Sequence, residues 1–360
     1  MEITRMDKMK QTAGDNSSNI QIAGDCRIGI TAADAIAISR EVAQHEIDRY
    51  KQEALAVAEE RFEKIAEKAV ESILERNPKL LSSFREPAIQ VALYDTYKKY
   101  IESGDDELGD NLIILLIERL NEVERNTKQF LIDDARNILP KLSRTNLAFL
   151  ALYVFSQINI PFKCRKEYEE LLAKLKKLTA EVAEITTLDI AYLKQSGCTM
   201  SIPMIQTSKS IAECLLDTYE YYFSKGITLD VLNNTILQKH PIHNIDDAKM
   251  LTLLDFPKGG NALLRFSSKK RVDDFFTEND YPEYQKFVED VISAQPKPTL
   301  EEVKKFHIDL DSNWKEVFDL WEKPNVRSIS IMPVGLYIGS IYLGKVIDVK
   351  IPQEIFYPQF

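Results

Sequence analysis

Two histidines offer the first candidate chemistry, because the chain has only four and these two stand close together. His240 and His243 have the spacing at which a helix presents two ligands on one face. Pro241, however, favours a loop over a helix at this place. A zinc site needs three or four ligands, no cysteine lies nearby, and Asp246 and Asp247 are ordinary acids. We therefore expect no metal ion and no cofactor.

Phosphate-binding and nucleophilic motifs give no firmer lead. Neither G-x-x-x-x-G-K-[ST] nor G-x-G-x-x-G occurs, and a plain turn explains the Lys-Gly-Gly-Asn of residues 258–261 better than a phosphate site does. G-x-S-x-G is absent, and Cys198 and Cys214 have no histidine nearby in sequence. We expect no catalytic residue, although a nuclease-like enzyme whose scattered acids meet only in the fold stays an alternative. A solvated helix face accounts for three acids of the middle region: Glu118, Glu122 and Glu124.

Composition indicates a globular, mainly α protein of more than one domain. The chain has 360 residues, 44% hydrophobic and 28% charged, with only 12 glycines and 14 prolines. A net charge of −10 argues against a nucleic-acid-binding surface, and the basic run at 269–271 is followed at once by Asp273 and Asp274. Sparse cysteines without C-x-x-C spacing predict free thiols in a reducing cytoplasm.

Membrane and export signals are weak. Residues 1–10 mix acids and bases and lack the apolar region of a signal peptide. The most lipid-like stretch, residues 329–349, contains Pro333, Lys345 and Asp348, which makes a poor membrane span. We expect a soluble cytoplasmic protein. An effector that perturbs membranes through residues 329–351 is kept as an alternative.

The segment before residue 31 alternates between apolar and polar side chains, which predicts a short strand or a pair of strands. Such a strand is unstable alone, so it must pair with the body of the chain, pair with copies of itself, or stay disordered. Pairing between copies would align amides into ladders and interlock isoleucines. The candidate self-association residues are Asn19, Ile20, Gln21, Ile22, Cys26, Ile28 and Ile30.

A long helix is predicted directly after this segment. Thr31 suits an N-cap, and residues 32–76 contain no glycine or proline. A continuous helix of this length would span roughly 67 Å at ~1.5 Å per residue. Either a coiled coil or a helix packed along its own domain fits its apolar stripe: Ile47, Tyr50, Ala54 and Val57, then Phe62, Ile65, Ala69 and Ile73.

The remaining chain reads as short helices with a mixed end. We expect a helical bundle over 77–160, a second helical region over 161–295 and a small α+β region over 296–360. Within the last region, 300–321 reads as one helix that buries Trp314 and Trp321. Residues 333–345 predict a helix rich in small residues, and 347–351 alternate like a strand.

Several motifs resemble a bacterial family. Residues 14–21, Gly-Asp-Asn-Ser-x-Asn-Ile-Gln, are followed by Gly29-Ile30 and an alanine-rich helix. They resemble a family that opens with Lys-Gln-x-x-Gly-Asp-Asn-Ser-x-Asn-Ile-Gln and a long helix, and the resemblance extends over about residues 1–160. Residues 331–335, Ile-Met-Pro-Val-Gly, resemble a closing Leu-Thr-x-Val-Gly element that is weakly similar to the abortive-infection alpha family. Here Ile331-Met332 replaces Leu-Thr.

The N-terminal motif is also similar to amyloid-signalling and RHIM-like motifs, whose core is Ile/Val-Gln-Ile/Val-Gly. This chain departs from that core by one alanine, in Ile20-Gln21-Ile22-Ala23-Gly24. Together these resemblances imply a self-associating, non-enzymatic protein of antiphage defence. They imply as partners further copies of the chain and a phage protein trigger or another defence protein. Membrane contact is not favoured.

Overall fold

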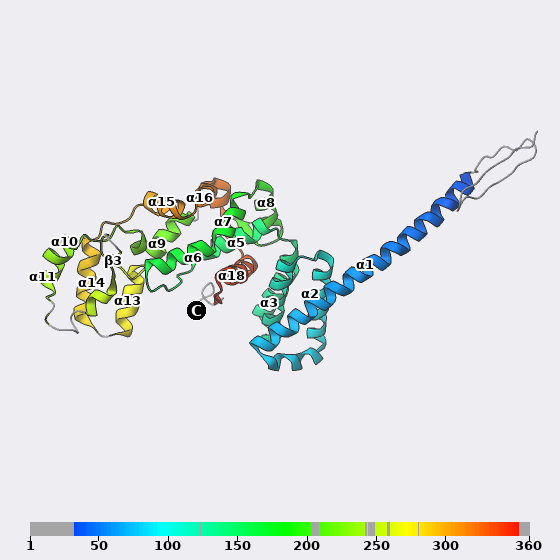
Figure 1. Cartoon of the computed structure of the whole chain (residues 1–360), viewed down its shortest axis with the longest axis horizontal. Helices are drawn as coiled ribbons and strands as arrows, with labels where there is room; N and C mark the ends of the chain where they lie inside the picture. Colours follow the sequence, from blue (N-terminus) through cyan, green and yellow to red (C-terminus); the bar gives the residue numbers. More distant parts are fainter. Residues whose placement is uncertain are drawn as a thin grey trace, which may run out of the picture. The chain divides into compact units, whose positions relative to one another are not determined.

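Helices make up most of the chain in the computed structural model, which confirms the mainly α prediction (Figure 1). The structure describes residues 32–122, 124–202, 209–241, 243, 249–257, 260–279 and 281–352, with the side chains of all of these except 32–50, 81 and 82. The chain divides into two compact units, residues 1–60 and 61–360. The predicted β-forming segment lies outside the described residues: Asn19, Ile20, Gln21, Ile22, Cys26, Ile28 and Ile30. Its self-association stays a prediction, and so do the five predicted domain ranges.

The long helix α1 runs over Ala32–Arg76, as its freedom from glycine and proline predicts. Asn77 ends this helix because its backbone is extended and its side chain accepts a hydrogen bond from the Lys79 N–H at 3.3 Å. Pro78 then starts the next element, since the residue before a proline avoids the helical region. Three elements follow: η1 (Pro78–Arg85), α2 (Pro87–Ser103) and α3 (Asp106–Asn121).

One hydrophobic core joins the last part of α1 to α2 and α3. Ile65, Ala69 and Ile73 are buried at three- and four-residue spacing, so one face of the helix contacts its neighbours. Gly104 allows the tight turn between α2 and α3 with its φ of 64°, a region that side chains rarely adopt. The Arg61 guanidinium donates to the Ile101 carbonyl at 2.6 Å beside this turn.

The largest core surrounds helix α5 (Arg144–Gln157), whose apolar side chains are buried all round. Helix α18 (Pro333–Ile347) packs against α5 so closely that a Cβ on Gly339 would lie 2.7 Å from the Leu150 carbonyl oxygen. Small residues therefore permit this helix pair to approach. The other elements around this core are α4 (Thr127–Ile138), η2 (Leu139–Lys141), α6 (Arg165–Lys174), α7 (Lys176–Ala183), α8 (Thr187–Gln195), α9 (Ile211–Phe223), α15 (Leu300–Leu310), α16 (Trp314–Glu322) and α17 (Pro324–Arg327).

A third core lies between α9 and α15 in the sequence. Its elements are α10 (Leu229–Val231), η3 (Leu232–Ile236), α11 (Leu237–Lys239), η4 (Lys249–Leu253), β2 (Leu254–Asp255), β3 (Leu263–Leu264), α13 (Lys269–Glu278) and α14 (Pro282–Ala294). Strands β2 and β3 pair antiparallel. A second antiparallel pair joins β1 (Thr199–Ser201) to β4 (Ile329–Ile331), with Met200 opposite Ser330.

Two predicted elements near the C-terminus are wrong in detail. Residues 300–321 form two helices, because Asp311 has an extended backbone and accepts hydrogen bonds from Thr179 and from the Asn313 N–H. Residues 347–351 form no strand, because Asp348 adopts the left-handed conformation and reverses the chain. Trp314 and Trp321 are buried, as predicted.

Candidate functional site

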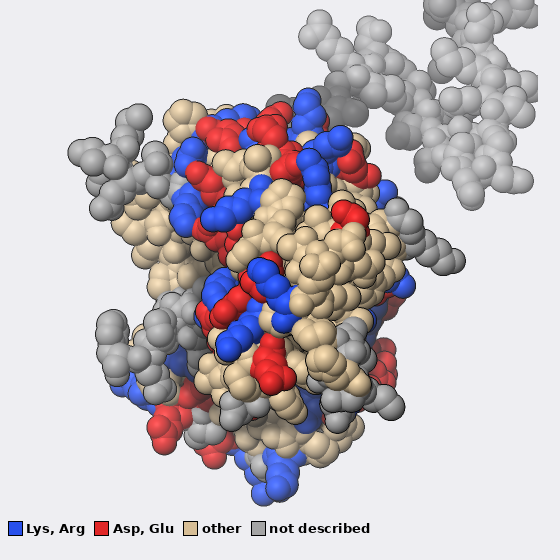
Figure 2. All heavy atoms as spheres, turned by 90° about the vertical axis from the view of Figure 1, so that its left-hand side faces the viewer, with Lys and Arg blue, Asp and Glu red and all other residues tan. Residues whose placement is uncertain are grey.

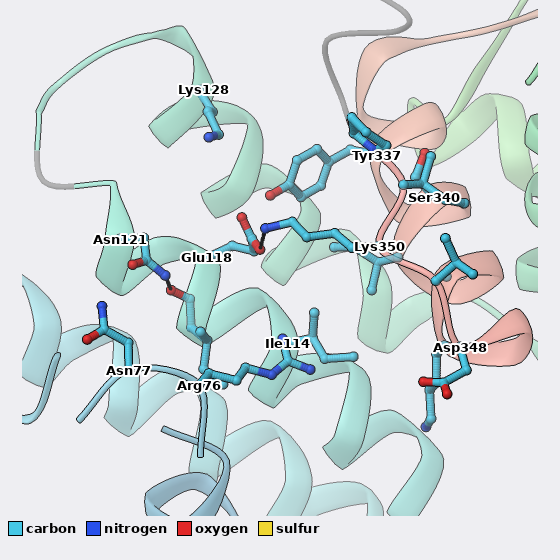
Figure 3. Close-up of a pocket in the computed structure, with 17 residues that line it drawn as sticks. Arg76, Asn77, Ile114, Glu118, Asn121, Lys128, Tyr337, Ser340, Asp348 and Lys350 are labelled. Atoms are coloured by element: carbon cyan, nitrogen blue, oxygen red, sulfur yellow. Dashed lines mark hydrogen bonds and ion pairs between the residues drawn. The ribbon is translucent and has the colours of Figure 1, made fainter. Parts of the chain in front are cut away.

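A cleft of about 880 Å³ opens between α3 and the C-terminal end of α18 (Figure 3). Its volume lies in the range of small-molecule sites. Ile114, Tyr337 and Ile341 give it apolar walls, and the end of α1 contributes Arg76. The complete lining is Arg76, Asn77, Ile114, Ile117, Glu118, Asn121, Lys128, Tyr337, Ser340, Ile341, Gly344, Lys345, Asp348, Val349, Lys350, Ile351 and Pro352.

Polar pairs join α18 and the residues after it to α3. The Tyr342 hydroxyl donates to Glu107 at 2.9 Å, and Lys345 Nζ lies 2.9 Å from Asp110. Figure 3 shows Lys350 reaching across to Glu118, where Nζ and Oε1 are 3.1 Å apart. These three contacts bind the two segments without filling the space between them.

Electrostatics favours the charged form of the α3 carboxylates. Burial alone would raise the pKa of Glu107, but hydrogen bonds from Lys177 and Tyr342 bring it below its usual value. Burial also opposes ionisation of Asp110, yet Lys68 and Lys345 lower the pKa of this carboxyl. Both groups are therefore anions at neutral pH and hold their lysine and tyrosine partners.

A reversed turn after α18 positions Lys350. The Val349 N–H donates to the Gly344 carbonyl at 3.0 Å, and Asp348 has a φ of 58°. A Cβ on Gly344 would lie 2.7 Å from the Val349 carbonyl oxygen, so glycine is required for this close approach. The turn directs the chain back towards α3 and places Lys350 opposite Glu118.

Two residues of the cleft present side chains that a ligand could contact. Ile114 is half-buried, whereas its neighbours from Leu112 to Ile117 are otherwise buried. Arg76 has no carboxylate partner among the described residues, while Lys128 pairs with Glu122 at 3.3 Å. The cleft can thus take an apolar group over Ile114 and an acidic group at Arg76.

A separate candidate surface lies on α1. Its side chains from Lys51 to Glu60 are almost all exposed, including Leu55 at 60% and Val57 at 46%. On a helix of 3.6 residues per turn, Leu55 and Val57 are about 160° apart, and Ala54 and Ala58 lie in the arc between them. We call these four residues, which together cover nearly half of the helix circumference, the α1 face. None of the four belongs to a hydrophobic core formed by the described residues.

The two histidines have different surroundings among the described residues, which do not include Asp246 and Asp247. His240 Nε2 lies 3.0 Å from Asp290, whose pKa this hydrogen bond lowers, and the imidazole packs edge-on against Phe287. His243 is exposed in a loop. Within the described ranges, no three His, Cys, Asp or Glu side chains are grouped so as to hold a metal ion.

The described residues also do not bring the other candidates from the sequence together into a catalytic or phosphate-binding site. Of the Lys-Gly-Gly-Asn stretch, residues 258 and 259 lie outside the described residues, and the Gly260 N–H donates to the Pro257 carbonyl in a turn. Burial raises the pKa of both Cys198 and Cys214, which disfavours a reactive thiolate. The solvated-face interpretation was wrong for Glu118, which lines the cleft and pairs with Lys350. Helical spacing alone could not show that the C-terminal turn returns to this face.

Surface charge and hydropathy add two observations. On the face drawn in Figure 2, Lys and Arg side chains are interspersed with Asp and Glu side chains and form no continuous basic surface. None of the helices in the described part of the chain is both long enough and apolar enough to cross a bilayer.

Comparison with known proteins gives a family but no activity. No curated protein and no solved structure matches the chain. A protein-family model described as ":-like" matches residues 29–357. Because this match covers most of the sequence, the chain belongs to that family.

Proposed function

We propose that the chain is a self-assembling bacterial defence protein, active against phage without a reaction of its own, and that α1 is its assembly helix. The exposed α1 face carries this proposal. A single helix without tertiary contacts is marginally stable in water. Burying a side chain such as Leu55 or Val57 against a second copy would contribute roughly 1.5–3 kcal/mol. Association would therefore supply packing for residues 51–60 of α1, since only the later part of the helix, with Ile65, Ala69 and Ile73, joins a core of the described residues.

The sequence before α1 supports the same proposal. Parallel association of α1 would bring together the alternating segments that carry Ile20 and Ile22. Strand pairing between copies and helix pairing would then stabilise each other. The resemblance to amyloid-signalling motifs, despite the additional Ala23, points in the same direction.

The cleft offers a contact point for the proposed trigger, a phage protein or another defence protein. Arg76, the last residue of α1, lines the cleft, and Ile73, one turn earlier, is anchored in the core shared with α2 and α3. An occupant with an acidic group at Arg76 would thus contact the anchored end of the assembly helix. Such an occupant would change the assembly equilibrium if it bound the assembled and the free chain with different affinities.

Light scattering of the full-length protein tests the assembly proposal. We expect the double variant Leu55→Glu/Val57→Glu to lower the mass of the native particle, because like charges meet and apolar burial is lost. The matched control, Gln52→Glu/Ala56→Glu, adds the same charge to the opposite face of α1 and should keep the native mass. Circular dichroism should show the same helical content in both variants.

Two results would contradict the proposal. One is a native mass of 41.3 kDa, the mass of a single chain, for the unaltered protein. The other is an unchanged oligomeric mass in the Leu55/Val57 variant. Protection of bacteria from phage should be lost in this variant and kept in the control.

A further inference from the structure

A second, smaller pocket of about 220 Å³ lies where the loop after α5 meets α13. Its lining combines aromatic rings, two carboxylates and one guanidinium: Pro161, Phe162, Phe266, Ser267, Arg271, Asp274, Phe275 and Glu278. Phe162 packs against the largest core, and Phe266 packs against the third core. The pocket therefore sits at a boundary between cores, a common position for ligand sites.

Buried tyrosines make the walls of this pocket rigid. The Tyr222 hydroxyl lies 3.2 Å from the carbonyl oxygens of both Phe162 and Arg265, so one donor ties the two walls together. The Tyr219 hydroxyl accepts from the Ile160 N–H at 3.1 Å and holds the same loop. Preorganised walls lower the entropic cost of binding.

Aromatic rings form the apolar part of the pocket. The rings of Phe266 and Phe275 are 5.3 Å apart at an interplanar angle of 61°, and Phe162 contributes the third ring. The negative faces of such rings attract cations within about 6 Å of the ring centre. Rings of this kind also provide contact area for methyl groups.

The charges of the pocket favour a positive ligand. Asp274 and Glu278 lie one helical turn apart on α13, and neither has an ion-pair partner among the described residues. The Arg271 guanidinium is already bound to Asn159, donating to its carbonyl oxygen at 3.1 Å. Lys269 pairs with Asp273 at 2.9 Å. The hydrogen bond to the neutral Asn159 orients Arg271 away without cancelling its charge, so two carboxylates and one guanidinium leave the pocket lining with one excess negative charge.

We propose that this pocket binds an alkylated ammonium group, with its methyl groups against the three phenylalanine rings and its charge beside Asp274 and Glu278. An anion would be attracted by Arg271 alone and repelled by both carboxylates, so the excess negative charge of the lining disfavours it. A metal ion would have to exchange its hydrating water molecules for aromatic walls and only two carboxylate ligands. A trimethylammonium group avoids both problems because it is a large, weakly hydrated cation whose single charge is surrounded by apolar methyl groups.

Calorimetric titration of the full-length protein with choline tests this inference. The matched ligand is 3,3-dimethylbutan-1-ol, which has the same shape but no charge. We expect choline to bind at least tenfold more tightly than the alcohol. The variant Asp274→Asn/Glu278→Gln should lose this tenfold preference, whereas Asp273→Asn, on the same helix but outside the pocket lining, should keep it. Equal binding of both ligands, or an equal loss of the preference in Asp273→Asn, would overturn the proposal.

Three probes distinguish the source of the ammonium group: free choline, a peptide that contains trimethyllysine, and phosphatidylcholine vesicles. Saturable binding of any one of them, lost in the Asp274/Glu278 variant, supports the site and identifies its source. Absence of binding for all three refutes it. This site goes beyond the proposed assembly, so the native mass of the variant should equal that of the unaltered protein.

Discussion

A buried histidine should make this protein acid-sensitive. The His307 side chain is 0% exposed, and its Nδ1 lies 2.8 Å from the Val303 carbonyl oxygen, which requires a donor there. Its Nε2 lies 2.8 Å from the Tyr168 hydroxyl. In the neutral ring, which burial favours, Nε2 accepts from this hydroxyl. Burial lowers the pKa of His307 from 6.5 to about 4.

The magnitude follows from this difference. Because the folded pKa is lowered, the unfolded chain binds a proton first, so the stabilisation is complete above pH 6.5 and is lost as the pH falls towards 4. At about 1.36 kcal/mol per pH unit, the full loss is about 3 kcal/mol. By about pH 4.5, roughly 2.5 kcal/mol of it should be gone.

Urea unfolding at several pH values measures this loss. Tryptophan fluorescence is a suitable signal because the Trp314 ring centre lies 4.8 Å from that of His307. Carboxylates whose pKa is lowered by their partners, such as Glu302, also stabilise the fold less in acid. The comparison with His307→Gln therefore isolates the contribution of the histidine. The free-energy difference between the two proteins should change by about 2.5 kcal/mol from about pH 7 to 4.5. A difference that stays constant over this range would refute the reasoning.

Two further predictions concern α18. Gly339→Ala should lower the free energy of unfolding by about 1–2 kcal/mol, since overpacking against the Leu150 carbonyl outweighs the gain in helix propensity; chemical unfolding checks this, and an unchanged midpoint would contradict it. Asp348→Gly should raise the same free energy by about 0.5 kcal/mol, because relief of the left-handed strain exceeds the entropic cost of glycine. A lower melting temperature for Asp348→Gly would show that the side chain contributes a contact that outweighs this strain.

Local signals predicted much of the helical fold. The absence of glycine and proline, followed by Asn77-Pro78, sets the length of α1, and Pro282 occupies the first position of α14, where proline is favoured. Such rules act within a few residues of the chain. They failed at Asp311, where a distant partner, Thr179, stabilises an extended backbone in a stretch that otherwise reads as helix.

The cleft and the smaller pocket could not be predicted from the sequence in the same way. Glu118 and Lys350 are separated by more than two hundred residues, and only the left-handed turn at Asp348 brings them together. Phe162, Phe266 and Phe275 carry no spacing signal either, because their rings come from two loops and a helix.

The sequence by itself determined the helical class, the uninterrupted α1 and the alternating segment before it, because periodicity and the absence of helix breakers are local properties. It also carried the family resemblance. Tertiary structure alone decided which polar groups meet in the cleft and which carboxylates of α13 stay unpaired. The physical reason is that ion pairs, cavities and ring contacts depend on distances between segments, and those distances are set by how whole helices pack.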